Sequence, residues 1–322
     1  MSVPGAAPRT VHVRVPATSA NLGPGFDTLG LALSVYDELA VTSLAPGELE
    51  IEVAGTGADE IPRDASHLVV RTIRYCYEAV GRPVPGLRIV AHNGIPHGKG
   101  MGSSGAAVAA GVLAAKGLLE GEAELSDTDM LRLATELEGH PDNVAPALFG
   151  GLTIAWDENG VPQHKKLLVH RGVAPVVFVP DRTMSTSTAR SVLDAAVSRE
   201  DAVFNVSRSA LLIAALTQSP DLLLSATEDK LHQERRGEAM PETFALVRAL
   251  RSRGFAAVVS GAGPSVLVLA DGPGRRVAAA EVVAEIGGGA WQPLMLAVDF
   301  KGGTVRTSPE AAALEAKTEV LS

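Results

Sequence analysis

The chain has 322 residues, and its 28 basic and 37 acidic side chains leave a formal charge of −9 with an isoelectric point near 5.4. This acidic balance disfavours non-specific nucleic-acid binding, which depends on a basic surface. A single cysteine, Cys76, excludes an intrachain disulfide, and no apolar run resembles a signal peptide or reaches the length of a membrane span, so we expect a cytoplasmic protein without a membrane partner.

The first half of the chain is predicted to contain strands followed by helices. Apolar alternation or β-rich composition predicts strands at residues 11–15, 49–53 and 87–91. Helical periodicity or alanine-rich composition predicts helices at residues 64–80, at 106–119 and from 126 to about 138. Ser126 and Asp129 have the spacing of a capping box, which supports the start of the third helix.

The second half continues the mixture. Helices are predicted at residues 187–193, 202–216, 242–251 and 275–286, and strands at 176–179, 256–260, 265–269 and 294–298. The order does not follow the strict alternation of a doubly wound sheet, so we predict an α+β fold in two lobes. Turn-forming residues cluster at 157–162 and divide an N-terminal domain (1–160) from a C-terminal domain (161–322). The Ala/Glu-rich tail from residue 308 is expected to fray.

A glycine-rich loop at residues 95–106 carries the strongest local signal. Three glycines within five positions free the backbone to turn its N–H groups inward, Ser103 and Ser104 follow, and a predicted helix begins. The start of a helix attracts anions through its unpaired N–H groups and its dipole, and Lys99 adds positive charge. The loop therefore predicts a phosphate site.

Two other nucleotide-binding patterns do not fit this loop. Residues 100–105 match the dinucleotide pattern G-x-G-x-x-G, but Pro96, His97 and Lys99 lengthen the loop, and the acidic residues at 120–124 precede a helix instead of ending a strand. The nucleotide P-loop string G-x-x-x-x-G-K-[ST] does not occur in the sequence. We reject both, and the alternative that stays open is a tightly packed turn without a ligand.

Residues 96–106 resemble the phosphate loop P-x-x-x-G-L-G-S-S-A of the GHMP kinases (galactose, homoserine, mevalonate and phosphomevalonate kinases), with Met101 for Leu and Gly105 for Ala. Further segments resemble motifs of the homoserine kinase group in the family's order, at residues 16–30, 136–146, 185–190, 229–236 and 260–265. The resemblance implies the two-lobed GHMP kinase fold, with an N-terminal nucleotide-binding lobe, a C-terminal α/β lobe and the active site between them.

The resemblance implies that ATP lies along the loop. The implied phosphate-binding residues are Pro96, Gly98, Lys99, Gly100, Met101, Gly102, Ser103, Ser104, Gly105 and Ala106. His67 and Leu68 stand on the adenine side, although the family usually has Asn at the position of His67. Mg²⁺ prefers hydroxyl, carboxylate and phosphate oxygens. Its implied ligands are Ser104 and Glu136, the alternative for Glu136 being a solvated acid, while Glu138 is expected to point elsewhere on the helix.

The substrate implied by the resemblance is L-homoserine, which is phosphorylated on its side-chain hydroxyl in threonine biosynthesis. Arg190 and Arg236 occupy the family positions that hold the carboxylate, and Asp27 occupies the position that holds the ammonium. The rest of the implied pocket comprises Asn21, His140, Asn143, Thr186 and Gly263. Each also has a structural alternative, such as a turn acid for Asp27 or a helix N-cap for Thr186.

The implied catalytic residues are Asn143, Ser104 and Glu136. An amide is not a base at neutral pH, so we expect Asn143 to orient the acceptor hydroxyl while the loop and magnesium stabilise the γ-phosphate. Two alternatives stay open: a kinase for another small hydroxylated amino acid or alcohol, and a non-catalytic relative that binds a ligand. The resemblance also allows a homodimer.

Overall fold

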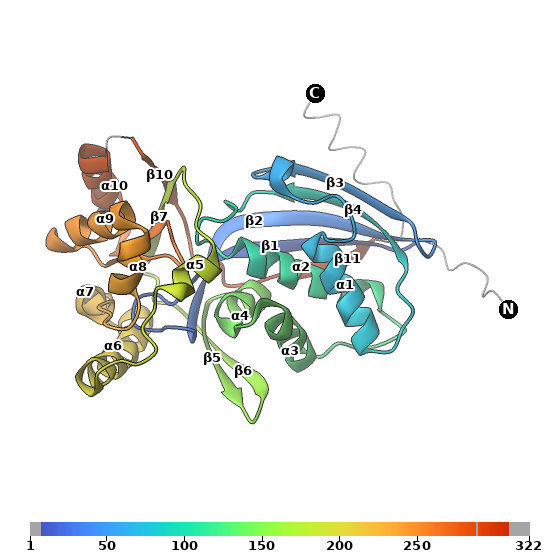
Figure 1. The fold of residues 1–322 in the computed structure, drawn as a ribbon, viewed down its shortest axis with the longest axis horizontal. Helices are drawn as coiled ribbons and strands as arrows, with labels where there is room; N and C mark the ends of the chain where they lie inside the picture. Colours follow the sequence, from blue (N-terminus) through green and yellow to red (C-terminus); the bar gives the residue numbers. More distant parts are fainter. Residues whose placement is uncertain (1–7, 288, 309–322) are drawn as a thin grey trace.

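A computed structural model of the chain describes residues 8–308 except residue 288. Two sheets, each covered by helices, form two lobes placed side by side (Figure 1). The predicted α+β class and the two-lobed arrangement are therefore confirmed. Among the described residues, no helix is both long enough and apolar enough to cross a membrane.

The larger sheet has seven strands and belongs mainly to the first half of the chain. They are β1 (Thr10–Ala20), β2 (Leu29–Leu44), β3 (Leu49–Gly55), β4 (Gly86–Asn93), β5 (Leu152–Glu158), β6 (Val161–Leu167) and β11 (Thr304–Ser308). The order is β11-β1-β2-β4-β3, and the β5–β6 hairpin joins the start of β2. All neighbours are antiparallel except β3 and β4.

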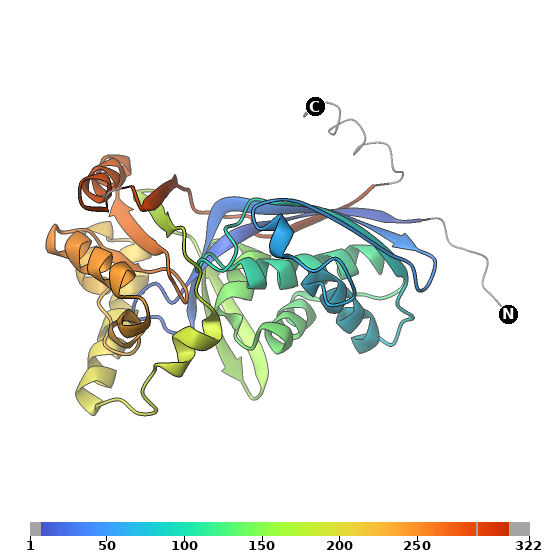
Figure 2. The same cartoon turned by 45° about the horizontal axis from the view of Figure 1, so that its top comes forward.

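The helices of the first lobe lie on one face of this sheet (Figure 2). They are α1 (Leu68–Ala79), α2 (Ser103–Leu118), α3 (Asp127–Glu138) and α4 (Pro141–Phe149), with a short 3₁₀ turn η1 at Ala58–Glu60. Helix α2 is buried on most sides. Its small side chains let it pack closely against β1, α1 and α3. The capping box of α3 is confirmed, because the Asp129 N–H donates to Ser126 Oγ at 3.1 Å and the Ser126 N–H donates to the Asp129 carboxylate at 3.2 Å.

The smaller sheet is antiparallel, in the order β10-β7-β9-β8. Its strands are β7 (Val173–Pro180), β8 (Ala257–Val259), β9 (Val266–Asp271) and β10 (Trp291–Met295). The helical segments of this lobe are α5 (Thr186–Ser191), α6 (Arg199–Thr217), η2 (Pro220–Leu222), α7 (Leu223–Ala226), α8 (Gln233–Ala239), α9 (Pro241–Ser252) and α10 (Pro273–Gly287). Val176 and Phe178 face a core shared with α9 and α10, whereas Val177 and Val179 join the core that continues into the first lobe.

Each predicted helix and strand has a counterpart, although the last predicted strand, at 294–298, forms three residues earlier as β10. The cluster of turn residues at 157–162 is the turn of the β5–β6 hairpin within one sheet, because Glu158 pairs with Val161. A domain boundary there would divide this hairpin, so we propose the division after β6. The tail from residue 309 lies outside the described residues.

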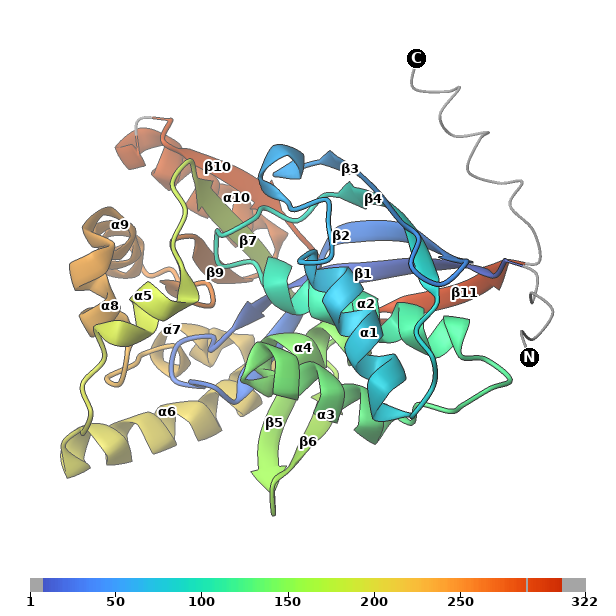
Figure 3. The same ribbon diagram turned by 45° about the vertical axis from the view of Figure 1, so that its right-hand side comes forward.

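The chain crosses between the lobes twice. It enters the smaller sheet after β6 and returns along residues 296–303, where the Tyr36 hydroxyl donates to Asp299 at 2.8 Å and the Gly303 N–H donates to the Ala147 carbonyl at 2.7 Å. β11 then pairs with β1 at the edge of the larger sheet. Helix α5 lies at the junction of the lobes in both Figure 1 and Figure 3. The loops that meet at this junction form the candidate site.

Candidate active site

The glycine–serine loop connects β4 to α2, and its glycines are required by its backbone. Gly98, Gly100 and Gly102 have φ values of 62°, 72° and 69°, in the left-handed region that glycine adopts without strain. A Cβ on Gly102 would lie 1.9 Å from Thr18 Oγ1, and one on Gly100 would lie 2.3 Å from the Ser260 carbonyl oxygen. The backbone of the loop therefore packs directly against both lobes.

Thr18 on β1 holds this loop and Asn143 together. Its N–H donates to the Met101 carbonyl at 3.0 Å, and its hydroxyl donates to Asn143 Oδ1 at 2.8 Å. The Met101 side chain is fully buried under the loop. Because Oδ1 is occupied, the amide NH₂ is the part of Asn143 that is left to donate into the neighbouring cavity.

A cavity of about 200 Å³ lies between the loop, the β1–β2 connection and the second lobe. Predicted site residues that line it are Asn21, Asp27, Gly98, Gly100, Gly102, Ser103, Ser104, His140, Asn143, Thr186, Arg190, Arg236 and Gly263. Those that do not are His67, Leu68, Pro96, Lys99, Met101, Gly105, Ala106 and Glu136. The structure thus brings the implied substrate residues and the serines of the loop to one place.

The acid beside Ser104 is Glu138. Ser104 Oγ donates to Glu138 Oε2 at 2.8 Å, and both residues line the cavity. Burial raises the pKa of Glu138, because the desolvation cost exceeds the effect of the Ser104 hydrogen bond. Glu138 is the last residue of α3, where the helix meets the start of α2.

The prediction that Glu136 accompanies Ser104 is therefore wrong. Glu136 is exposed, accepts a hydrogen bond from the Tyr75 hydroxyl at 2.7 Å and pairs with Arg132 at 2.9 Å. Side chains two residues apart point about 200° apart around a helix, so only one of the two acids can face the loop. The angle between the two acids follows from their spacing on the helix, but the acid that faces the loop depends on the packing of α3 against α2.

Asp27 and Arg190 form a two-pronged ion pair across the cavity. Arg190 Nη1 and Nη2 lie 3.1 and 2.5 Å from the two carboxylate oxygens of Asp27. Both side chains are about one-third exposed, at 33% and 35%, so solvent screens the pair. The ring of Phe26 lies beneath Arg190, at 5.5 Å from the centre of its guanidinium.

Arg236 lies 46 positions later in the chain and is only 2% exposed. Its Nη1 donates to the Gly261 carbonyl at 2.9 Å, and its Nε approaches the Ala189 carbonyl at 3.3 Å. Burial and the nearby Arg190 lower the pKa of Arg236. In the described part of the chain, no carboxylate pairs directly with this guanidinium, so a ligand carboxylate would complement it.

Asp142 is a cavity residue that the sequence analysis missed. It is 3% exposed, and its Oδ1 has no hydrogen-bond partner among the described residues. Burial, followed by the charge of Asp27, raises the pKa of Asp142 to about 7, although Arg190 acts in the opposite direction. The signal was present, since Asp142 stands inside the segment that resembles a family motif and directly precedes Asn143.

Two other predicted pocket residues have additional structural roles. Asn21 has a φ of 68°, accepts from the Asp27 N–H at 3.1 Å and donates to the Gly261 carbonyl at 3.0 Å, which ties the β1–β2 loop to the second lobe. Thr186 is the first residue of α5, but the N-cap role belongs to Ser185, whose Oγ accepts from the Thr188 N–H at 3.1 Å.

His67 precedes α1 and is 5% exposed, with Nδ1 unpartnered among the described residues. Burial lowers its pKa, which favours the neutral ring. Neither His67 nor Leu68 borders the cavity, so their place on the adenine side stays a prediction.

Comparison with known proteins adds independent findings. Family models match the GHMP kinases N terminal domain at residues 67–151 and the GHMP kinases C terminal domain at residues 209–288. A homoserine kinase of Leifsonia xyli subsp. xyli is 62% identical over 314 residues, covering 97% of each chain. A homoserine kinase of Streptomyces avermitilis is 49% identical over 306 residues, covering 95% of this chain and 98% of the relative.

Solved structures of other kinases have the same fold as this chain. The crystal structure of a homoserine kinase from Cytophaga hutchinsonii superposes with a TM-score of 0.82 at 25% identity, covering 95% of this chain and all of the other. The crystal structure of L. major mevalonate kinase in complex with R-mevalonate, at 17% identity and a TM-score of 0.65, shares the fold. The resemblance predicted from the ordered motifs is confirmed, and the chain belongs to the homoserine kinase group of the GHMP kinase family.

Proposed function

We propose that this kinase transfers the γ-phosphoryl group of ATP to the side-chain hydroxyl of L-homoserine, giving O-phospho-L-homoserine for threonine biosynthesis. The observation that carries the proposal is one cavity in which a glycine–serine phosphate loop meets Asp27, Arg190 and Arg236. An acid and two arginines complement the two charges of an amino acid. The homoserine kinases at 62% and 49% identity support this substrate.

The zwitterion has a partner for each charge. Its carboxylate would bind the guanidinium groups of Arg190 and Arg236, and its ammonium would bind Asp27 and the unpartnered oxygen of Asp142. Binding would replace the internal ion pair between Asp27 and Arg190 by two ion pairs with the ligand. The same charges would not complement a neutral sugar, which favours an amino acid as the acceptor.

The phosphates of ATP would lie at the N-terminus of α2, where backbone N–H groups and the helix dipole favour negative charge. Ser104 and Glu138 fit Mg²⁺, because they present hard oxygen donors and, among the described residues, the half-buried Glu138 carboxylate is hydrogen-bonded only to the Ser104 hydroxyl. A bound magnesium ion would supply charge neutralisation at the β- and γ-phosphates.

Asn143 would orient the acceptor hydroxyl. Thr18 occupies its Oδ1, so its Nδ2 is free to donate to the hydroxyl oxygen and hold it in line with the γ-phosphorus. Phosphoryl transfer through a loose transition state relies on alignment and charge stabilisation, so a strong base beside the hydroxyl is not required. A homodimer, which the family resemblance allows, and a cytoplasmic location, which the sequence composition favours, stay predictions.

The test is ADP release by the purified protein with Mg-ATP and one acceptor at a time: L-homoserine, D-homoserine, L-threonine, L-serine, mevalonate and galactose. We expect turnover with L-homoserine far above that with the others. Turnover with a different acceptor would keep the kinase and refute the substrate. No turnover from folded, ATP-binding protein would favour the non-catalytic alternative.

Gly102→Ala is expected to reduce kinase activity by about 100-fold or more, because a Cβ at 1.9 Å from Thr18 Oγ1 must push the loop away from β1 in an already left-handed backbone. Steady-state kinetics and ATP binding by calorimetry measure the effect. Gly121→Ala is the matched control, since its φ of 84° is equally left-handed but nothing lies within 4 Å of its Cβ position. Equal activity of the two variants would contradict the role of this loop.

Binding of L-homoserine is expected to strengthen as the pH rises through about 7, where Asp142 ionises. The ionised carboxylate attracts the ammonium, so KM should fall by about tenfold between about pH 6 and about pH 8. Calorimetry near neutral pH in buffers of different ionisation enthalpy should detect proton release on binding. Asp142→Asn should remove both effects, and a wild-type KM independent of pH would contradict the assignment.

A further inference from the structure

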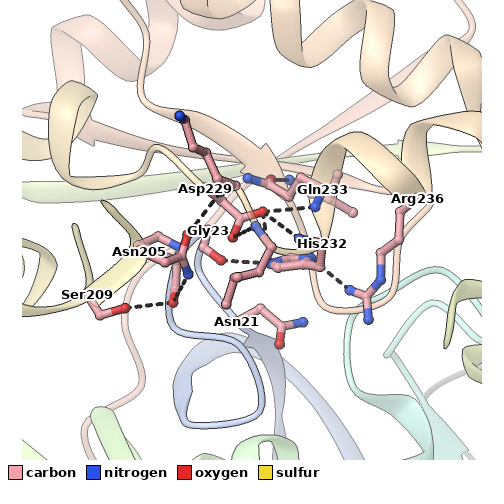
Figure 4. Close-up of polar contacts among 12 residues, drawn as sticks. Asn21, Gly23, Asn205, Ser209, Asp229, His232, Gln233 and Arg236 are labelled. Carbon is pink, nitrogen blue, oxygen red and sulfur yellow. Dashed lines mark hydrogen bonds and ion pairs between the residues drawn. The ribbon is translucent and has the colours of Figure 1, made fainter. Parts of the chain in front are cut away.

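Behind the cavity, a buried polar network joins the β1–β2 loop to the start of α8 (Figure 4). Asp229 anchors one end of this network, and its side chain is fully buried. The Asp229 carboxylate accepts the N–H groups of Leu231, His232 and Gln233 at 3.1, 3.0 and 2.9 Å. These bonds fix the first turn of α8 and the backbone that carries His232.

His232 is 1% exposed, and its two ring nitrogens have different partners. Nε2 lies 2.7 Å from the Gly23 carbonyl, which can only accept, so Nε2 carries the hydrogen. Nδ1 lies 3.3 Å from Arg236 Nη1, which can only donate, so Nδ1 accepts. Both contacts need the neutral Nε2–H tautomer, and burial lowers the pKa of His232 in the same direction.

Burial makes the net shift of the pKa of His232 downward, while the charges around the imidazole act in opposite directions: Asp229 and Asp27 favour the imidazolium, and Arg236 favours the neutral ring. Asp229 Oδ2 lies 3.6 Å from Nε2, Arg236 faces Nδ1, and Asp27 acts from the same loop as Gly23. The ring of Phe26 stacks on the imidazole with centroids 4.9 Å apart. The ring is therefore fixed on its face as well as at both nitrogens.

The partner at Nδ1 orients Arg236. Its Nη1 is shared by His232 and the Gly261 carbonyl, and its Nε points to the Ala189 carbonyl. Among the described residues Nη2 has no hydrogen-bond partner, and Arg236 borders the cavity. The network therefore leaves one guanidinium nitrogen for a ligand.

The partner at Nε2 belongs to the loop that carries Asp27. Gly23 binds His232, and the next carbonyl, that of Pro24, accepts from Asn205 Nδ2 at 3.0 Å and Ser209 Oγ at 2.7 Å. Figure 4 shows these groups converging on one turn of the loop. His232 is the member of this set that contacts both the loop and Arg236.

We propose that His232 is a positioning residue that fixes the separation between Arg236 and Asp27, and with it the spacing of the carboxylate and ammonium subsites for an α-amino acid. It does not border the cavity itself and acts through these two groups. The inference rests on the proposed function, because it gives that function its fit to the substrate.

The experiment compares three substitutions of His232 by steady-state kinetics. His232→Leu removes both contacts and should raise KM for L-homoserine about tenfold or more, with kcat and KM for ATP changed less than about threefold. His232→Asn keeps a polar acceptor near the position of Nδ1 and should recover most of the loss. His232→Gln keeps a donor near the position of Nε2 and should recover less.

Ser209→Ala is the matched control, since it removes a hydrogen bond to the same loop without touching Arg236. Its KM should stay near the wild-type value. A KM for His232→Leu equal to that of Ser209→Ala would overturn the proposal. So would an Asn variant whose KM is as high as that of His232→Leu. Failure of the wild-type enzyme to phosphorylate L-homoserine would instead refute the proposed function.

A measurement of the tautomer of His232 in the wild-type protein tests the proposal independently of kinetics. Nitrogen NMR of histidine-labelled protein near neutral pH should show one of the 8 histidines fixed as the Nε2–H tautomer, with its resonance absent from the His232→Asn spectrum. An Nδ1–H tautomer or an imidazolium at this position would overturn the proposal.

Discussion

Glu138→Gln is expected to lower kcat by about 100-fold or more while leaving KM for L-homoserine nearly unchanged. The carboxylate beside Ser104 is the acid that faces the phosphate loop, and its neutral isostere would weaken a magnesium site at the nucleotide phosphates. Titration of Mg²⁺ against the rate should show half-saturation at a higher metal concentration in the variant than in the wild type.

Glu136→Gln provides the matched control, because it makes the same chemical change two residues earlier on the same helix. Glu136 is exposed and bound to Tyr75 and Arg132, so the loss of its charge should alter kcat by less than about twofold. Equal losses in the two variants would refute the assignment to Glu138, and a loss confined to Glu136→Gln would restore the assignment made from the sequence.

Arg236→Ala is expected to raise KM for L-homoserine by about 100-fold, corresponding to roughly 3 kcal/mol of binding free energy. The guanidinium is buried and already fixed by the Gly261 carbonyl and His232, so it is ready to receive a carboxylate at little entropic cost. Initial rates at saturating ATP measure the change. Arg235→Ala is the control, since this neighbour is exposed and pairs with Asp194, and its KM should stay unchanged.

Arg190→Ala should raise KM for L-homoserine less than Arg236→Ala does, because it also frees Asp27 for the ammonium.

The ion pair between Asp27 and Arg190 should discriminate against ligands with a single charge. 4-Hydroxybutyrate offers only a carboxylate and 3-aminopropan-1-ol only an ammonium, so each would break the pair and leave one partner uncompensated. We expect neither to be phosphorylated at a rate comparable to L-homoserine, and efficient turnover of either would contradict the exchange of ion pairs.

Much of the fold could be predicted because its elements are locally encoded. The glycine–serine loop leads into α2, and the capping box starts α3, from residues adjacent in the chain. The longest strand, β2, was missed. Its start pairs with β5 and its end with β4, and Asp37 interrupts its apolar pattern. Asp37 stabilises the backbone outside the strand, because its carboxylate accepts hydrogen bonds from the N–H groups of Gly94 and Ile95 at the entry to the phosphate loop.

The residue types of the site could be predicted from the sequence, but the directions in which the side chains point could not. Arg190 and Arg236 could be paired through the family motifs, whereas their different exposure, 33% for the Arg190 side chain and 2% for Arg236, arises only from the packing of α5 and α8. The choice between Glu136 and Glu138 depends on how α3 is rotated against α2. The contact between His232 and the Gly23 carbonyl joins segments about two hundred positions apart, and sequence spacing carries no information about it.

The edge strand β11 also sets the order in which this protein can be completed during synthesis. β1 is synthesised long before its partner along one edge, Thr304–Ser308. Until then β1 exposes unpaired N–H and C=O groups, the kind of edge at which strands of different chains associate. A nascent chain synthesised only as far as β6 should therefore need protection from aggregation, and its first lobe should reach its final stability only after β11 has been synthesised and has paired with β1.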